Sequence, residues 1–190
     1  MAAASAGLAA EVQGVMRSQQ TRGSMLEDLF RSDLDLVICG TAASAKSALV
    51  GHYYAGPGNK FWRMLAQTGL TREELTPASY MRLLEYGIGL TDLVKGQAGN
   101  DAGLRFDRMS NELLRGKIAQ HQPRYLCFNG KRAAQQYFLT KAIGYGVQAA
   151  QLGKTILFVA PSTSGAANAA WDLAVWQDLA DRVHGIDGAA

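Results

Sequence analysis

The sequence contains only two cysteines and three histidines among its 190 residues, which limits the chemistry open to it. Cys39 and Cys127 each stand inside an apolar run. There is no Cys-x-x-Cys motif and no pair of histidines at metal-ligand spacing. Because zinc sites are built from such clusters, these absences argue against a metal centre. We therefore expect two buried free thiols and no disulfide.

Long apolar runs are also missing, and none approaches the roughly 20 residues that a membrane helix needs. The Ala-rich start, Met1 to Ala10, lacks the basic region of a secretory signal. We therefore expect a cytoplasmic protein with no membrane partner. The net charge is only +3, which permits binding to nucleic acid without predicting it. Neither Gly-x-x-x-x-Gly-Lys-Ser/Thr nor Gly-x-Gly-x-x-Gly follows a strand, which argues against a nucleotide-binding domain.

Four apolar runs, separated by helical patterns, are present instead. They predict strands at 35–39, 87–91, 125–128 and 155–160. Helices are expected at 25–30, 61–69, from 76 through the stripe at 81–84, and at 110–118, 132–139 and 171–183. This alternation predicts an α/β fold, a three-layer α/β/α sandwich around a mostly parallel four-stranded sheet. We expect an arm or short helix over 1–24, the domain over 25–184, a tail over 185–190, and a monomer.

The stretch from Val37 to Trp62 is the most informative part of the sequence. A buried strand ends at Cys39 and is followed by a loop of small and hydroxyl residues over 40–47. An aromatic cluster at 52–54 comes next, and Asn59 leads into a helix. All four predicted strands end in small or polar residues. Parallel strands bring their carboxyl ends to one edge of a sheet, so we expect the binding pocket there.

Four segments in this order resemble the uracil-DNA glycosylase superfamily, closest to its mismatch-specific uracil and thymine-DNA glycosylase branch. They are Gly51–Trp62, Gly87–Val94, Phe128–Lys131 and Pro161–Gly165, within a similarity that spans about residues 33 to 183. The run Ala-Ser-Ala-Lys-Ser at 43–47, followed by Tyr-Tyr-Ala, is similar to the related hypoxanthine-DNA glycosylases.

The resemblance implies an enzyme of base excision repair. Such an enzyme flips uracil out of DNA and hydrolyses its N-glycosidic bond, with uracil-containing DNA as partner and no metal or cofactor. It would be associated with the nucleoid through DNA. Tyr54 aligns with the stacking aromatic residue of the family. The backbone from Gly40 and Thr41 through Ala42 to Ser44 would bind the base. Asn59 would support this loop, and whether it also touches the base is left open.

One departure from the family concerns the catalytic side chain. The first motif usually reads Gly, an apolar residue, Asn or Asp, Pro, Gly, whereas here it reads Gly-Thr-Ala-Ala-Ser at 40–44. Ala42 stands where the Asn or Asp that positions the attacking water belongs, and a methyl group can neither accept nor orient a proton. Backbone N–H groups that stabilise the departing base could compensate, because that electrostatic effect is often the larger one.

Besides backbone N–H groups, a side chain from another loop could replace the catalytic group that is missing at Ala42. Asp92, at the end of the second strand, could orient water or stabilise positive charge on the sugar, although a capping role is equally compatible. Asp101 and Asp107 are weaker candidates of the same kind. His52 could act through water because imidazole titrates near neutral pH, although a structural histidine is also compatible. The catalytic candidates are therefore Asp92 and His52.

A second departure concerns contact with the duplex. After Pro161–Gly165 the family often has a long residue that enters the base stack, but this chain has Ala166-Ala167. We therefore expect activity on single and double strands with little dependence on the opposing base. The expected DNA contacts are Lys46, Ser47, Ser162, Ser164, Gly165 and Ala166, with positive charge added by Arg124, Lys131 and Arg132. A hypoxanthine-DNA glycosylase and a catalytically impaired binder of lesions or abasic sites remain the alternatives.

Overall fold

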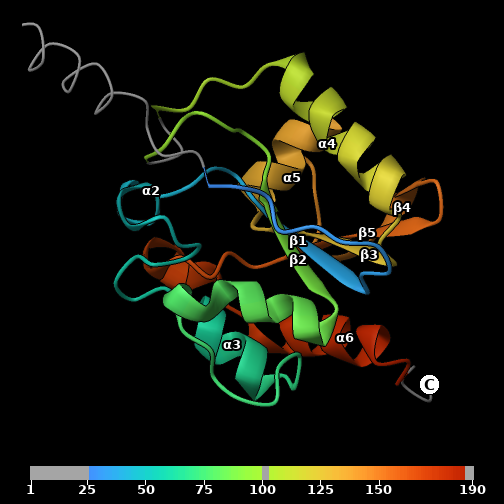
Figure 1. The fold of residues 1–190 in the computed structure, drawn as a ribbon. Helices are drawn as coiled ribbons and strands as arrows, with labels where there is room; N and C mark the ends of the chain where they lie inside the picture. The colour runs from blue at the N-terminus through green and yellow to red at the C-terminus, as the bar shows by residue number, and fades with distance from the viewer. Residues whose placement is uncertain (1–25, 100–102, 187–190) are drawn as a thin grey trace, which may run out of the picture.

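The computed structural model describes residues 26–99 and 103–186. The arm expected over 1–24 therefore lies outside the described residues, as does most of the expected tail. The centre of the molecule is a five-stranded sheet in the order β2-β1-β3-β5-β4 (Figure 1). Its strands are β1 (Leu36–Gly40), β2 (Ile88–Asp92), β3 (Tyr125–Asn129), β4 (Gly146–Leu152) and β5 (Thr155–Ala160).

The sheet has five strands, not the four predicted. The predicted strands correspond to β1, β2, β3 and β5, which are parallel, so the mostly parallel α/β architecture is confirmed. The additional strand, β4, is antiparallel and pairs with β5 at the edge of the sheet. Its sequence, Gly-Val-Gln-Ala-Ala-Gln-Leu, leaves every residue at least partly exposed. An edge strand needs no continuous apolar run, so the hydrophobic pattern did not reveal it.

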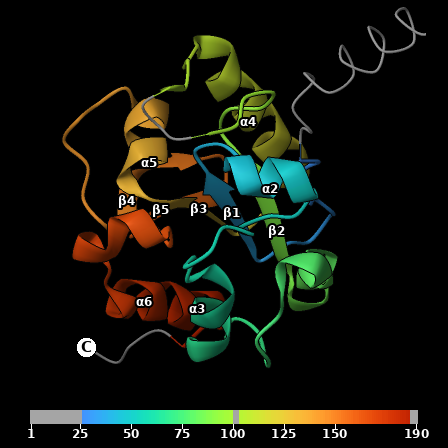
Figure 2. The same cartoon turned by 90° about the vertical axis from the view of Figure 1, so that its left-hand side faces the viewer.

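Helices cover both faces of the sheet, which gives the three layers (Figures 1 and 2). The 3₁₀ segment η1 (Pro77–Tyr86) and helices α3 (Phe61–Gln67) and α6 (Leu173–Val183) cover one face, and α4 (Arg108–His121) and α5 (Lys131–Phe138) cover the other. Side chains alternate along the fully buried β1. Leu36 and Ile38 join one hydrophobic core, whereas Val37 and Cys39 join the other. Both cysteines are buried free thiols.

Two local predictions were wrong. The short helix expected at 25–30 is absent from residues 26–30, where Leu29 instead pairs with Leu90 through reciprocal backbone hydrogen bonds of 2.8 and 3.1 Å. The loop expected at 40–47 turns into helix α2 (Ala45–Val50), whose N-cap is the Ser44 side chain accepting from the N–H of Ser47. The apolar residues at 25–30 do have helical spacing, but pairing with β2 decided their conformation. In α2 the Ser44 cap decided the start of the helix.

The carboxyl ends of the parallel strands meet at one edge of the sheet. Gly40 lies beside Asp92 in the register of β1 and β2, and Asn129 lies beside Ala160 in that of β3 and β5. In Figure 2, α2 lies in front of β1 on this side of the molecule. The strand order therefore brings together the polar ends of segments that are far apart in sequence. Among the described residues, no helix has the length and apolar character needed to cross a bilayer.

Candidate active site

A cavity of about 540 Å³ opens at this carboxyl edge. This volume is typical of small-molecule sites. The ends of β1, β2 and β3 and the turn after β5 form its walls. The sequence-predicted residues among those lining it are Gly40, Thr41, Ala42, Ser44, Ser47, Tyr54, Asn59, Asp92, Lys131, Arg132, Ser162, Ser164 and Ala166. The topology thus brings most of the predicted residues into one cavity.

Asp92 is the carboxylate of this cavity and is only 5% exposed. Its place requires a glycine at position 40, because a Cβ there would lie 2.5 Å from Asp92 Oδ1. No hydrogen bond to its carboxylate is formed within the described chain, and its charged neighbour is Lys95, whose Nζ lies 3.9 Å from Oδ2. The carboxylate therefore keeps its lone pairs for a ligand or a water molecule.

The surroundings of Asp92 bring the pKa of its carboxyl group close to neutral pH. Burial raises the pKa of Asp92, Lys95 opposes this, Asp28 raises it further and Lys117 lowers it, leaving a pKa of about 6. A pKa near the working pH lets a carboxylate both accept a proton and release it. Strong pKa shifts of buried groups in cavities are typical of functional sites.

Tyr54 forms the aromatic wall of the cavity. Its ring stacks on Phe61 with a centroid distance of 3.8 Å and an interplanar angle of 22°. Its hydroxyl is buried, forms no hydrogen bond within the described residues, and lies 3.4 Å from the point that a Cβ on Gly40 would occupy. Burial, followed by the charge of Asp92, raises the pKa of Tyr54 well above its usual value. It therefore stays a neutral hydroxyl beside the carboxylate.

Asn129, at the end of β3, is a polar residue to which sequence reasoning gave no role, although its motif was part of the resemblance. Its Nδ2 donates to Thr163 Oγ1 and its Oδ1 accepts from the Thr163 N–H, both at 2.9 Å. These two bonds assign the nitrogen and the oxygen of the Asn129 side-chain amide. Asn129 also lines the cavity, and its amide acts on the Tyr54 hydroxyl, lowering the pKa of Tyr54 against the larger effect of burial. Its position at the carboxyl end of a central strand was the available signal.

The loop around Ala42 is pinned by its neighbours. The N–H groups of Leu93 and Val94 donate to the carbonyls of Gly40 and Thr41, both at 2.9 Å. Asn59 Oδ1 accepts from the N–H of Phe61 at 3.0 Å, so this side chain stabilises the start of α3 while it lines the cavity. This bond is local to the start of α3, and no hydrogen bond joins Asn59 to residues 40–44 of the described chain, so its support of that loop stays a prediction.

Several other candidates lie outside the cavity wall. His52 is not among the lining residues, and its ring lies 6.0 Å from that of Tyr80. Lys46 is exposed on α2, and Gly165 packs against the backbone of Gly58. Asp107 caps α4 by accepting from the N–H of Ser110, and Asp101 lies outside the described residues. The geometry therefore favours Asp92 over these alternatives.

Two further expectations about DNA contacts change with the structure. Ser47 lines the cavity but is 2% exposed, and its hydroxyl accepts from the Ala55 N–H and bonds Ser44, so it serves the loop. Arg124 precedes β3, at the opposite edge of the sheet, where it pairs with Asp35 at 3.0 Å. Neither side chain is available for phosphate at the cavity.

The positive charge at the cavity comes from α5. Lys131 and Arg132 both line it. The Lys131 ammonium lies 4.4 Å from the centroid of the Tyr145 ring, and the Arg132 guanidinium lies 5.2 Å from that of Phe106. Tyr145 also lines the cavity, and it was missed because it precedes the edge strand β4.

Comparison with known proteins agrees with this architecture. The model of the uracil DNA glycosylase superfamily matches residues 27–180. A solution NMR structure titled as that of a "putative uracil DNA glycosylase" from Methanosarcina acetivorans is similar to the chain with a TM-score of 0.58 and 21% sequence identity. The match covers 85% of this chain and 98% of that one. At this identity the structural likeness concerns the fold alone. The family match extends over most of the sequence, and the chain belongs to the uracil DNA glycosylase superfamily.

Proposed function

We propose that this protein is a monofunctional DNA glycosylase that flips uracil out of DNA and hydrolyses its N-glycosidic bond. The observation that carries the proposal is the Asp92 carboxylate, which lies in the cavity beside the Tyr54 hydroxyl and has no hydrogen-bonded partner in the described chain. It supplies an acid-base group at a site where Ala42 supplies none. Family membership supports the reaction class.

The proposed reaction is a hydrolysis at the C1′ carbon of the flipped nucleotide. The electron pair of the C1′–N bond leaves with the base as positive charge develops on the sugar, and a water oxygen forms the new bond to C1′. Asp92 accepts the proton of that water, and its negative charge stabilises the developing cation. The departing base anion takes up a proton. Tyr54 holds the base by stacking and its ring is kept in place by Phe61.

The fixed amide of Asn129 supports a preference for deaminated bases. A side-chain amide carries both donors and an acceptor, and uracil presents the complementary groups, the O4 carbonyl and the N3–H. Hypoxanthine presents the same arrangement with O6 and N1–H, which makes hypoxanthine excision the second candidate. Cytosine and adenine present an amino group and an unprotonated ring nitrogen at these positions, so neither matches the pattern.

Incubation with single-stranded oligonucleotides that carry one uracil or one hypoxanthine, followed by alkaline cleavage of abasic sites, tests the proposal. Product from uracil is expected. Product from hypoxanthine alone would assign the second candidate. Retention of uracil-containing or abasic DNA without any product would identify a lesion-binding protein and refute the proposed activity. An Ala42→Asn variant serves as an internal comparison, since it restores the residue usual in the family.

Excision is expected to depend little on the base opposite uracil. The 3₁₀ segment η3 (Gly165–Ala170), at the cavity rim, has the sequence Gly-Ala-Ala-Asn-Ala-Ala, and its residues Ala166 and Ala167 line the cavity. Methyl groups cannot fill the gap that a flipped base leaves in the stack. Single-turnover rates on U·G, U·A and single-stranded substrates should therefore agree within about tenfold, a difference of about 1.4 kcal/mol in activation free energy. A strong preference for U·G would contradict this expectation.

A further inference from the structure

A cluster of charged side chains lies on the protein side of Asp92, and the proposed reaction does not use it. Asp28, in the segment before β1, is paired with Lys95 at 2.6 Å and with Lys117 of α4. Lys95 follows β2 and faces Asp92 at 3.9 Å. Thr91, next to Asp92, donates its hydroxyl to Asp28 Oδ1 at 2.7 Å. The cluster thus joins three separate segments behind the cavity.

Lys95 is held in place at the centre of this cluster. Its ammonium group donates to the Leu26 carbonyl and to the Tyr53 hydroxyl, both at 3.0 Å, in addition to its contact with Asp28. Tyr53 in turn donates to the Glu27 carbonyl at 3.2 Å. The Lys95 side chain is only 18% exposed. These partners keep Lys95 from moving the further ångström that a direct hydrogen bond to Asp92 would require.

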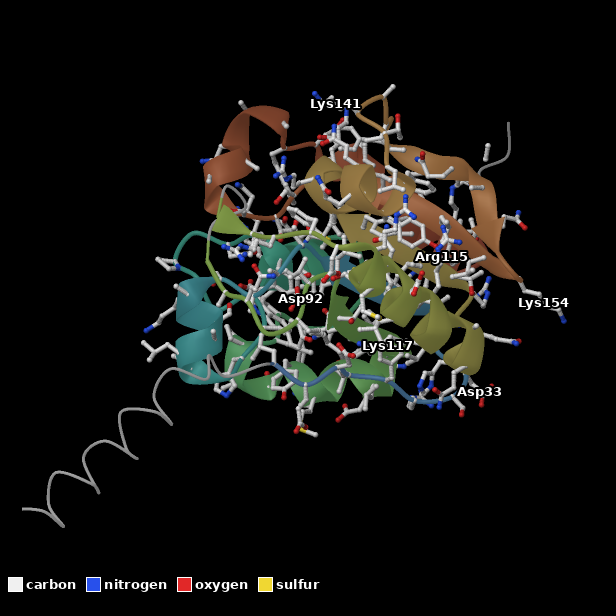
Figure 3. The ribbon with its side chains drawn as sticks, turned by 90° about the horizontal axis from the view of Figure 1, so that it is seen from above. Asp33, Asp92, Arg115, Lys117, Lys141 and Lys154 are labelled. Carbon is white, nitrogen blue, oxygen red and sulfur yellow. The ribbon has the colours of Figure 1, made fainter. Side chains whose placement is uncertain are left out.

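Asp28 keeps the Lys95 ammonium group from moving closer to the Asp92 carboxylate. Burial acts to raise the pKa of Asp28, but Lys95, Lys117 and the Thr91 hydroxyl together lower it, so it carries its charge at neutral pH. Figure 3 labels Asp92 and also Lys117, which extends from α4. With Lys117 on its other oxygen, Asp28 carries two ammonium partners and draws Lys95 toward itself. Lys95 therefore acts on the Asp92 carboxylate through its charge and does not form a hydrogen bond with it.

We propose that Lys95 is the positioning residue of Asp92, and that Asp28 and Lys117 hold it where it keeps the carboxylate ionised without occupying its lone pairs. This rests on the proposed function in one respect, that Asp92 is the acid-base group of the reaction. A direct ion pair would make Asp92 a weaker base, whereas removing Lys95 would leave a buried carboxylate to be protonated near neutral pH.

The other groups that face Asp92 do not supply charge in this range. They are Tyr53, Tyr54 and Cys39. Burial raises the pKa of each above its usual value, with Asp92 acting in the same direction, so all three remain neutral. The charges that act on Asp92 thus come from Lys95, Asp28 and Lys117. Replacing any of these three side chains should therefore shift the pKa of Asp92 in a direction set by the charge that is removed.

The test is a ¹³C NMR titration of the Asp92 carboxyl carbon, assigned by its loss in Asp92→Asn, in the wild type and two variants. Lys95→Met should raise the pKa of Asp92 by at least about one pH unit, since an opposite charge at this range lowers a carboxyl pKa by about 1–3. Asp28→Asn should lower it, because a like charge is removed and Lys95 is freed. Lys154→Met, in the distant β4–β5 turn, is the matched control and should leave the titration unchanged.

Shifts of opposite sign in Lys95→Met and Asp28→Asn support the proposal, whereas shifts of the same sign or an unmoved titration overturn it. If Lys95→Met does not fold, Lys117→Met replaces it with the same expected sign. The titration needs no activity, so the expected shifts in a protein without glycosylase activity would refute the proposed function and leave the positioning role standing. In an active protein, the acid limb of the pH–rate profile should move with the titration.

Discussion

Replacing Asp92 with asparagine is expected to lower the single-turnover rate of uracil excision by at least about 100-fold, the lower range for a positioned acid or base. The substitution keeps the size of the side chain but removes the proton acceptor and the negative charge from the cavity. In the wild type the rate should fall as the pH drops through about 6, where Asp92 becomes protonated. In Asp92→Asn this acid limb should disappear along with most of the rate.

A stability measurement separates loss of chemistry from loss of fold. The pKa of Asp92 in the folded protein, about 6, lies above the value of 3.8 for an unperturbed Asp side chain. The folded protein therefore binds more protons between these values, and stability falls as pH rises through the interval. Above pH 6 the buried, ionised Asp92 carboxylate lowers the free energy of unfolding by about 3 kcal/mol. Asp92→Asn should thus unfold at higher temperature than wild type at pH 8, with the gain shrinking toward pH 4. A near-wild-type excision rate in this variant would sink the catalytic assignment.

Replacing Gly40 with alanine should lower excision to a similar extent, by about 100-fold, without touching a group that reacts. The new Cβ would lie 2.5 Å from Asp92 Oδ1 and 3.4 Å from the Tyr54 hydroxyl, so the carboxylate must move. A misplacement of about 1 Å in an active site can cost about this much in rate. The measurement is the same single-turnover assay, combined with a melting curve.

Gly116→Ala provides the matched control for this substitution. Gly116 lies within α4, and apart from its chain neighbours and the backbone of its own helix, a Cβ there would meet no atom of the described residues within 4 Å. Alanine in a helix interior should raise the stability by about 0.5–1 kcal/mol and leave the excision rate unchanged. If Gly40→Ala were as active as Gly116→Ala, the tight packing of Asp92 against β1 would have no part in the reaction.

The sequence predicts those parts of the fold that have a strong hydrophobic pattern. The four parallel strands are apolar because they are buried on both faces, and this made them visible. The polar residues at their ends predicted where the cavity lies. Strand β4 was hidden because an edge strand can be half-polar, and α2 because its six residues depend on the Ser44 cap rather than on an apolar stripe.

The charged cluster behind Asp92 could not be predicted from local patterns. Asp28 and Lys117 are 89 positions apart and meet only because α4 packs over the start of the domain. Asp28 itself lies in a segment that was predicted to be helical, where it would have read as an ordinary surface charge. In the same way, the His52 hypothesis could be weighed only once the direction of the loop after α2 was known.

The stacked rings of Tyr54 and Phe61 connect the wall of the cavity directly to the hydrophobic core. Phe61 is fully buried and belongs to the core on the α3 side of the sheet, yet it contacts the ring that forms the cavity wall. Trimming Phe61 would leave a void behind Tyr54 and give that ring freedom to tilt. Under the proposed function, Phe61 would then shape the surface that recognises the base without touching it, and packing changes in the core would alter substrate preference.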